Sequence, residues 1–191
     1  IVASLVGSEM CIRDRYNEFD QLRIAGVRHA DLKGYSFSRD DVDARSLANQ
    51  YAQMLGHIFT HEMKPMEVEI LVAEVDFEGD NLRNQMFHIL YDGTVKDESS
   101  FAVLGGESEE IFARFESLHK DNMPLKKALN ACIDALTAGE RDIEPDDLEV
   151  AELSIQNGRR AFRRIVTSEI QGPVSNTHLT LPTNGPVWSG V

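Results

Sequence analysis

The chain has 191 residues, a length that suits one domain with a core of its own. Hydrophobic residues make up 42% and charged residues 27%, which is typical of a globular protein, and no stretch reaches the roughly 20 apolar residues that span a bilayer. The formal net charge of −13 repels phosphate backbones, so nucleic acid is not expected as a partner, and neither is a membrane.

The cysteines and the first residues bear on the cellular compartment. Cys11 and Cys132 are too few for a disulfide scaffold, and Cys132 lies in an apolar helical pattern typical of a small buried side chain. Residues 1–6 are apolar, but the basic residues Arg13 and Arg15 follow them, whereas a secretory signal carries its positive charge first. The sequence therefore predicts a cytoplasmic protein.

The first predicted elements are two helices joined by a short loop. Apolar residues at helical spacing predict a helix over 17–33, with an asparagine as its cap and Gly34 as its end. Residues 38–41 resemble a capping box, in which serine is followed three residues later by an acid. A second helix is predicted over about 40–63, stopped by Pro65, and the two should form an antiparallel pair.

The middle of the chain has the alternating pattern of strands. Residues 66–73 alternate with one face apolar, and 85–91 predict a second strand. The Asp-Gly dipeptide at 92–93 is a strong hairpin signal leading into 94–95. Residues 100–104 predict a short buried strand.

The last third predicts two more helices, over 107–119 and 125–138. The acidic run 140–147 is predicted to be a loop. Strands are predicted over 148–155 and 161–166, and they should form a final hairpin through an Asn-Gly turn. Strands stand in blocks between helix pairs, with no strand–helix–strand alternation. The order therefore predicts an α+β fold in which antiparallel sheets are layered between helix pairs.

Both ends of the chain lack the character of a folded domain. Residues 4–15 and 173–183 resemble recurrent translated sequencing adapters, and the tail, rich in proline and glycine, has no helical or strand period. The expected division is a non-native segment 1–15, a partial domain 16–172, and a second non-native, disordered segment 173–191.

Two histidines are candidate metal ligands. His57 and His61 stand four residues apart, so they can share one helix face, with Glu62 adjacent. A zincin helix has the order His-Glu-x-x-His, whereas here the second histidine is missing and Pro65 ends the helix. Polar residues at a helix end are the favoured interpretation, and no metal or cofactor is predicted. A metal-dependent hydrolase using this pair is the alternative, and it would contain stoichiometric zinc.

One cluster of basic residues and one glycine pair are candidate anion-binding sites. Arg159, Arg160, Arg163 and Arg164 form a cluster, but alternate residues of a hairpin face opposite sides, so the four should be divided. Salt bridges to acidic neighbours in the domain or across a subunit contact are favoured over phosphate binding. The glycine pair at 105–106 lacks the spacing of a phosphate loop and is read as a strand end.

Several sequence stretches are more specific indicators of a protein family than the periodicity of apolar residues. They follow one another in order over nearly all of residues 16–172. These stretches are YNEFDQLR at 16–23, LAN at 47–49, YAQ at 51–53, IFT at 58–60, KP at 64–65, EVE at 67–69, VAEV at 72–75, YDG at 91–93 and RRAFRRI at 159–165. In these stretches the chain resembles the α subunits of actinobacterial proteasomes.

The resemblance implies a four-layer αββα sandwich of the N-terminal-nucleophile hydrolase class, which agrees with the predicted order of elements. It also implies a homoheptameric ring stacked on a ring of β subunits. In this family, β subunits cleave peptides with an N-terminal threonine, while α subunits cap and gate the chamber. A ring ATPase activator docks on the α ring and feeds in proteins, in actinobacteria those tagged with a ubiquitin-like modifier.

The chain departs from the family pattern in one large respect. The gate helix and first strands that precede the region of Tyr16 in the family are absent, so the sandwich is expected to be incomplete. Residues used for gating and activator docking lie mostly in that part and are not carried over. The remaining sheets are expected to have exposed edges and uncovered apolar faces.

The alternative within the same fold is a catalytic β-type subunit. An N-terminal-nucleophile enzyme needs a processed Thr, Ser or Cys as its first residue, because the free amine serves as the base. This chain opens on Ile1, and the internal Thr60 and Thr94 have no free amine. No catalytic residue is therefore predicted, and the expected role is that of a structural subunit in a threonine-type endopeptidase complex.

Overall fold

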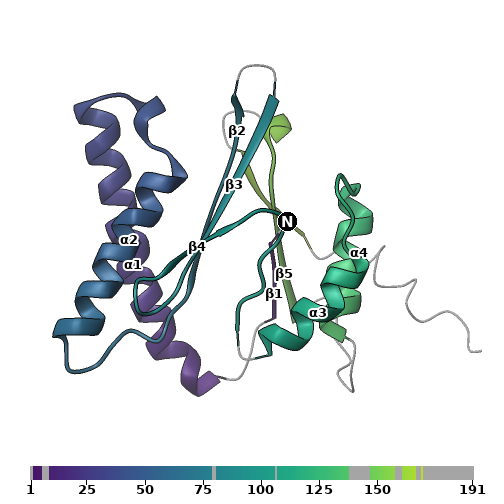
Figure 1. Ribbon diagram of the computed structural model, residues 1–191, viewed down its shortest axis with the longest axis horizontal. Coiled ribbons are helices and arrows are strands. Elements are labelled where there is room, and N and C mark those ends of the chain that lie inside the picture. Colours follow the sequence, from purple (N-terminus) through teal and green to yellow (C-terminus); the bar gives the residue numbers. More distant parts are fainter. Residues whose placement is uncertain are drawn as a thin grey trace, which may run out of the picture.

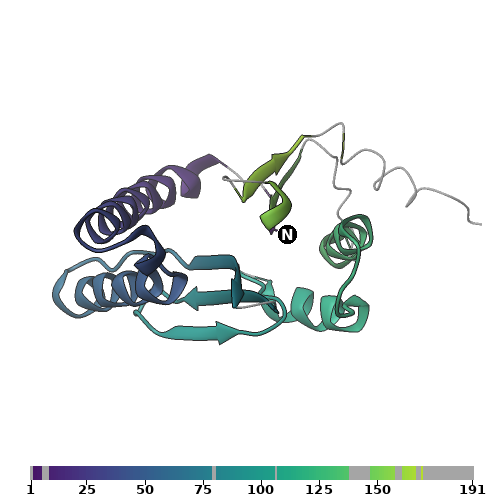
Figure 2. The ribbon, with the colours of Figure 1, turned by 90° about the horizontal axis from the view of Figure 1, so that it is seen from above.

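The computed structural model describes residues 2–5, 9–78, 81–105, 107–137, 147–157, 161–166 and 169. Within them lie two antiparallel sheets of three strands each and two pairs of helices. One helix pair stands at each end of the molecule, with the sheets between them (Figures 1 and 2). The predicted mixture of helices and antiparallel strands is confirmed. None of the described helices is both long enough and apolar enough to cross a bilayer.

The first helix pair consists of α1 (Glu9–Ser36) and α2 (Ala44–His61), which run in opposite directions as predicted (Figure 1). The predicted start of α1 at residue 17 is wrong, because no proline or glycine interrupts residues 9–16 and the helix continues through them. Gly34 does not end it either, since α1 runs on to Ser36.

The start of α2 also corrects the prediction. Residues 38–41 do not cap this helix, because Arg39–Asp41 form a separate 3₁₀ turn. The cap is Asp43, whose side chain accepts a hydrogen bond of 3.1 Å from the backbone N–H of Ser46. An aspartate directly before the helix satisfies a backbone donor that would otherwise lack a partner.

The first sheet has the order β2 (Ile70–Glu78), β3 (Asn81–Ile89) and β4 (Val95–Glu98). Its register places Ile70 opposite Ile89 and Val72 opposite Phe87, so these four apolar side chains share one face. That face packs on the helix pair in one buried cluster, whose other members are Leu22, Ala44, Ala48, Tyr51, Leu55 and Val68.

Two strand predictions need correction. The predicted strands 66–73 and 85–91 are β2 and β3, but β2 begins only at Ile70, β3 ends at Ile89, and both extend further into their hairpin than predicted. The predicted strand at 100–104 is not a strand. Phe101 instead packs its ring against Phe112, Phe115 and His119, with centroids 4.8, 4.9 and 5.2 Å away. Residues 100–104 are therefore held in place by side-chain contacts and not by strand pairing.

The Asp-Gly turn between β3 and β4 is confirmed. Gly93 has a positive φ of 86°, and its N–H donates to the carbonyl of Leu90 at 2.9 Å. The backbone N–H of Thr94 donates to the Asp92 carboxylate at 2.8 Å, and this hydrogen bond lowers the pKa of Asp92. Beside the turn, the rings of Tyr91 and Phe59 meet edge to face at 5.7 Å, which joins the turn to α2.

The second half contains α3 (Ser108–Leu118), α4 (Leu125–Thr137), β5 (Leu148–Leu153), the 3₁₀ turn Ile155–Asn157 and β6 (Phe162–Ile165). Both helices match their predictions to within a residue, and the predicted final hairpin is confirmed by antiparallel pairing of β5 with β6. The acidic loop at 140–147 lies outside the described residues except for Asp147.

A second buried cluster joins α4 to the sheet of β5 and β6, through Leu129, Ile133, Leu148, Val150 and Ile165. Cys132 lies beside a third cluster between α3 and α4 and is partly buried, in accord with its predicted packing role. Burial raises the pKa of its thiol.

The strand β1 (Val2–Leu5) lies in the segment predicted to be non-native. It pairs antiparallel with β5, with Val2 opposite Ala151. Strand pairing uses backbone groups that every sequence provides, so this strand does not test whether residues 1–15 are foreign. The predicted foreign tail 173–191 lies outside the described residues.

Candidate functional site

Several exposed apolar side chains lie along α1, with the charged Arg28 and Asp31 among them. Ile24, Val27, Leu32 and Tyr35 lie on one side of this helix, and Tyr35 is 93% exposed. At about 100° per residue, Ile24, Val27 and Tyr35 lie roughly opposite the fully buried Leu22, and Leu32 lies at the edge of this side, about 80° from Leu22. We call these four residues the α1 apolar surface. Several large apolar side chains gathered on one helix face are typical of a contact with another molecule.

A cavity of about 270 Å³ lies beneath the first half of α1, between α1, α2 and β2. Its polar groups come from Arg23 and Tyr51, and the rest of its lining is apolar. Arg23 is engaged by the Asp20 carboxylate, with contacts of 2.7 and 3.0 Å. Burial raises the pKa of Tyr51, although the nearby Arg23 opposes this. A neutral phenol beside a paired guanidinium provides neither a base nor a nucleophile at pH 7.

His57 and His61 lie together on the last turns of α2, as their spacing predicts. Their rings stack with centroids 4.3 Å apart and planes inclined by 22°, and both side chains are exposed. No group of three or more His, Cys, Asp or Glu side chains is placed to hold a metal ion anywhere in the described part of the chain. The absence of a metal-dependent hydrolase site stays a prediction.

The internal threonines have ordinary structural contacts. The hydroxyl of Thr60 donates to the backbone carbonyl of Gly56, one turn earlier on α2, at 2.8 Å. The carbonyl of Thr94 accepts a hydrogen bond of 2.9 Å from the N–H of Leu90 across the β3–β4 turn. The Thr60 hydroxyl also lies 2.7 Å from Nδ1 of His61. Both threonines are internal residues, so neither has the free α-amine that serves as the base in an N-terminal nucleophile.

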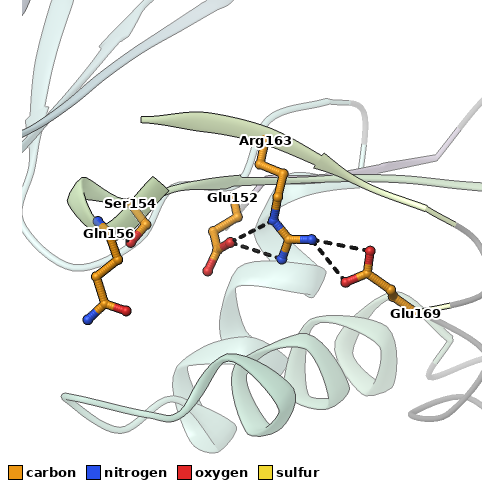
Figure 3. Close-up of polar contacts among 5 residues, drawn as sticks. All are labelled: Glu152, Ser154, Gln156, Arg163 and Glu169. Atoms are coloured by element: carbon orange, nitrogen blue, oxygen red, sulfur yellow. Dashed lines mark hydrogen bonds and ion pairs between the residues drawn. The ribbon is translucent and has the colours of Figure 1, made fainter. Parts of the chain in front are cut away.

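Arg163 is the centre of an ion-pair network with Glu152 and Glu169 (Figure 3). Its Nη2 atom lies 3.1 Å from Glu152, on the paired strand β5, and its Nη1 atom lies 2.9 Å from Glu169. Hydrogen bonds to Glu169 and then Glu152 raise the pKa of the guanidinium. The prediction of salt bridges within the domain is confirmed for Arg163. Arg164 is exposed on the other face of β6, and 159–160 lie outside the described residues.

Replacing Arg163 by methionine should lower the urea midpoint of unfolding at low salt, because both ion pairs are lost. The side chain is 38% exposed, so the effect should be small and should shrink further in about 1 M NaCl, where charges are screened. Arg164→Met is the matched control on the opposite face and should leave the midpoint unchanged at both salt concentrations. Equal shifts for the two variants would contradict a special role for Arg163.

Sequence reasoning missed one buried polar residue. His88 is 6% exposed, and it lies between two carboxylates, with Nε2 3.1 Å from Glu69 and Nδ1 3.8 Å from Glu98. It follows Phe87 and precedes Ile89, so alternation places it on the sheet face away from the helix pair. That alternation was the available signal, while its two acidic neighbours come from the residue before β2 and from the end of β4 and are not adjacent in sequence.

Comparison with known proteins gives a consistent result. A family model described as proteasome subunit matches residues 25–153. The chain is 55% identical over 157 residues to a proteasome subunit alpha of Acidimicrobium ferrooxidans, a match that covers 82% of this chain and 67% of that protein. Subunits of the same name from Acidothermus cellulolyticus and a Parafrankia species are 47% and 44% identical, with 69% and 70% of their lengths covered. The chain thus spans about two thirds of these relatives.

Proposed function

Because this chain belongs to the proteasome subunit family, we propose that it is a non-catalytic member of the outer α ring, which controls entry of substrates to the proteolytic chamber. The relatives are named as α subunits, which supports the α-type interpretation over the catalytic β-type alternative. The identity of 55% over 157 residues is the observation that carries this proposal.

The proposed complete fold is the four-layer αββα sandwich, of which residues 16–172 form part and to which 1–15 and 173–191 do not belong. Two observations support it. One helix pair packs on the sheet β2–β3–β4, and the other provides α4 to the sheet of β5 and β6. Each sheet also carries partly buried or exposed apolar residues on its other face, among them Leu71 and Phe162, as expected of surfaces that face a second sheet.

The subunit is proposed to contribute surface and no bond cleavage. Thr60 and Thr94 are internal residues, and the Thr60 hydroxyl donates a hydrogen bond to a backbone carbonyl of its own helix. Neither threonine therefore matches an N-terminal nucleophile, which uses its free α-amine as the base. The α1 apolar surface is suited to contacts between subunits, since burying it removes apolar area from water. The proposed partners are other α subunits in a seven-membered ring, β subunits, a ring ATPase activator and substrates tagged with a ubiquitin-like modifier, all in the cytoplasm.

The test is to express the full chain alone and together with an actinobacterial proteasome β subunit. The chain alone should hydrolyse no fluorogenic peptide. With the β subunit it should form stacked rings, visible by electron microscopy, that cleave the peptide. Peptide hydrolysis by the chain alone, or failure to assemble with the β subunit, would contradict the proposal.

Matched variants locate the nucleophile in the assembled particle. Thr60→Ala and Thr94→Ala in this chain should leave the peptidase rate unchanged, while alanine at the N-terminal threonine of the β subunit should abolish it. A large loss of rate in either variant of this chain, with rings still assembled, would favour the β-type alternative.

A further inference from the structure

The histidine pair at the end of α2 has hydrogen bonds that the sequence does not predict. The Nδ1 atom of His61 lies 3.1 Å from the backbone carbonyl oxygen of His57 and 2.7 Å from the hydroxyl oxygen of Thr60. A carbonyl oxygen only accepts, so the N–H that faces it belongs to Nδ1 of His61. The Thr60 oxygen can accept from the same N–H, because its own proton points to the carbonyl of Gly56 at 2.8 Å.

All of these contacts are satisfied together when the proton of the neutral His61 ring is on Nδ1. With the proton on Nδ1, the neutral ring carries its lone pair on Nε2. Histidines that bind metals are oriented in the same way, because a hydrogen bond from one ring nitrogen to a carbonyl directs the other nitrogen toward the ion. The neighbouring His57 ring is exposed and stacks on the His61 ring with centroids 4.3 Å apart, so it has to turn about its Cβ–Cγ bond before both Nε2 atoms can face one ion.

The location also suits a cation. Both histidines lie in the last turns of α2, where the carbonyl groups at the helix end carry partial negative charge. Imidazole nitrogens prefer Zn²⁺, Cu²⁺ and Ni²⁺, whereas Mg²⁺ prefers oxygen ligands. Two histidines at positions i and i+4 of a helix are a common half of a zinc site.

We propose that His57 and His61 form a surface site for a divalent transition-metal ion that prefers imidazole, with Zn²⁺ as the representative ion. The two Nε2 atoms supply two ligands, and water molecules complete the coordination. The ion would link two successive turns at the end of α2. This site differs from the zincin hydrolase considered from the sequence, because it has no third protein ligand and no catalytic glutamate. It is also independent of ring assembly.

The test is isothermal titration of the full chain with Zn²⁺ alone at pH 7.5, compared with His57→Gln and His61→Gln. Either substitution removes one of two ligands, so each should weaken binding by at least the roughly 10-fold that loss of an outer-shell partner costs. Mg²⁺ at the same concentration should give no heat of binding at this site.

His119→Gln is the control, because it removes a histidine that packs in the aromatic cluster of α3 and not at this site. It should retain the Zn²⁺ affinity of the unaltered chain. With Cu²⁺ as a spectroscopic probe, electron paramagnetic resonance should show two coordinated nitrogens, and one in each single variant. Unchanged Zn²⁺ affinity in His57→Gln or His61→Gln, or no binding by the unaltered chain, would overturn the proposal.

Discussion

Replacing Leu22 by alanine should lower the free energy of unfolding by about 2–5 kcal/mol, the range found when a large aliphatic side chain is removed from a packed core. Leu22 is fully buried, and it is the one large side chain of α1 among those described that has no exposed surface. It joins α1 to Tyr51 and Leu55 of α2 in the same buried cluster. A second close contact between the two helices is at Gly26, which lies under the hydroxyl of Tyr51.

The matched control lies on the same helix. Leu32 is 68% exposed, so Leu32→Ala should change the free energy of unfolding by no more than about 0.5 kcal/mol. Urea denaturation of the full chain, followed by circular dichroism, measures both variants. Similar losses for the two would mean that α1 is not docked through Leu22. Because Leu32 belongs to the α1 apolar surface, its substitution should instead weaken assembly with other subunits.

The helices could be predicted well where a local pattern decides them. Ala44, Ala48, Tyr51 and Leu55 are spaced at helical intervals and are all buried in α2. The same reasoning placed the start of α1 too late, because Asn17 can cap a helix but need not when the preceding residues are also helical. A residue that can cap a helix therefore does not by itself show where the helix begins.

Strand ends were harder to predict, because the register with a partner decides them. In β2, the apolar positions change from even residue numbers (70 and 72) to odd ones (75 and 77), yet backbone pairing with β3 continues without a break to Glu78 opposite Asn81. The run at 100–104 shows the opposite error. It is apolar enough for a buried strand, yet aromatic rings of α3 that come later in the sequence provide its contacts.

In the candidate sites, too, contacts between residues close in sequence could be predicted, whereas contacts between distant residues could not. The proximity of His57 and His61 follows from their spacing on one helix, and it could be predicted. The hydrogen bonds of His61, which depend on the side-chain rotamer, could not. The two carboxylates beside His88 come from segments about ten or more residues away along the chain, as does Glu152 beside Arg163, and only the paired strands bring them together.

Replacing Gly93 by alanine should have an effect as large as that of Leu22→Ala, for two separate reasons. Gly93 has a φ of 86°, where a side chain costs about 1–2 kcal/mol in backbone strain. A Cβ atom there would also lie 2.5 Å from the carbonyl oxygen of Ala52 and 2.8 Å from the backbone nitrogen of Gly56. Both obstacles are backbone atoms of α2, which cannot move aside as a flexible side chain would.

Gly105→Ala separates the two causes. Gly105 also has a positive φ, of 113°, but among the described residues no atom lies within 4 Å of the position a Cβ would take. It should therefore show the strain alone, while Gly93→Ala should lose about 3 kcal/mol or more, as expected when a steric clash adds to strain at one site. The difference between the two variants in urea denaturation measures how firmly the β3–β4 turn is held against α2. If both lose the same amount, the turn yields to the added methyl group, and the close backbone contact at Gly56 does not position this end of the sheet on the helix.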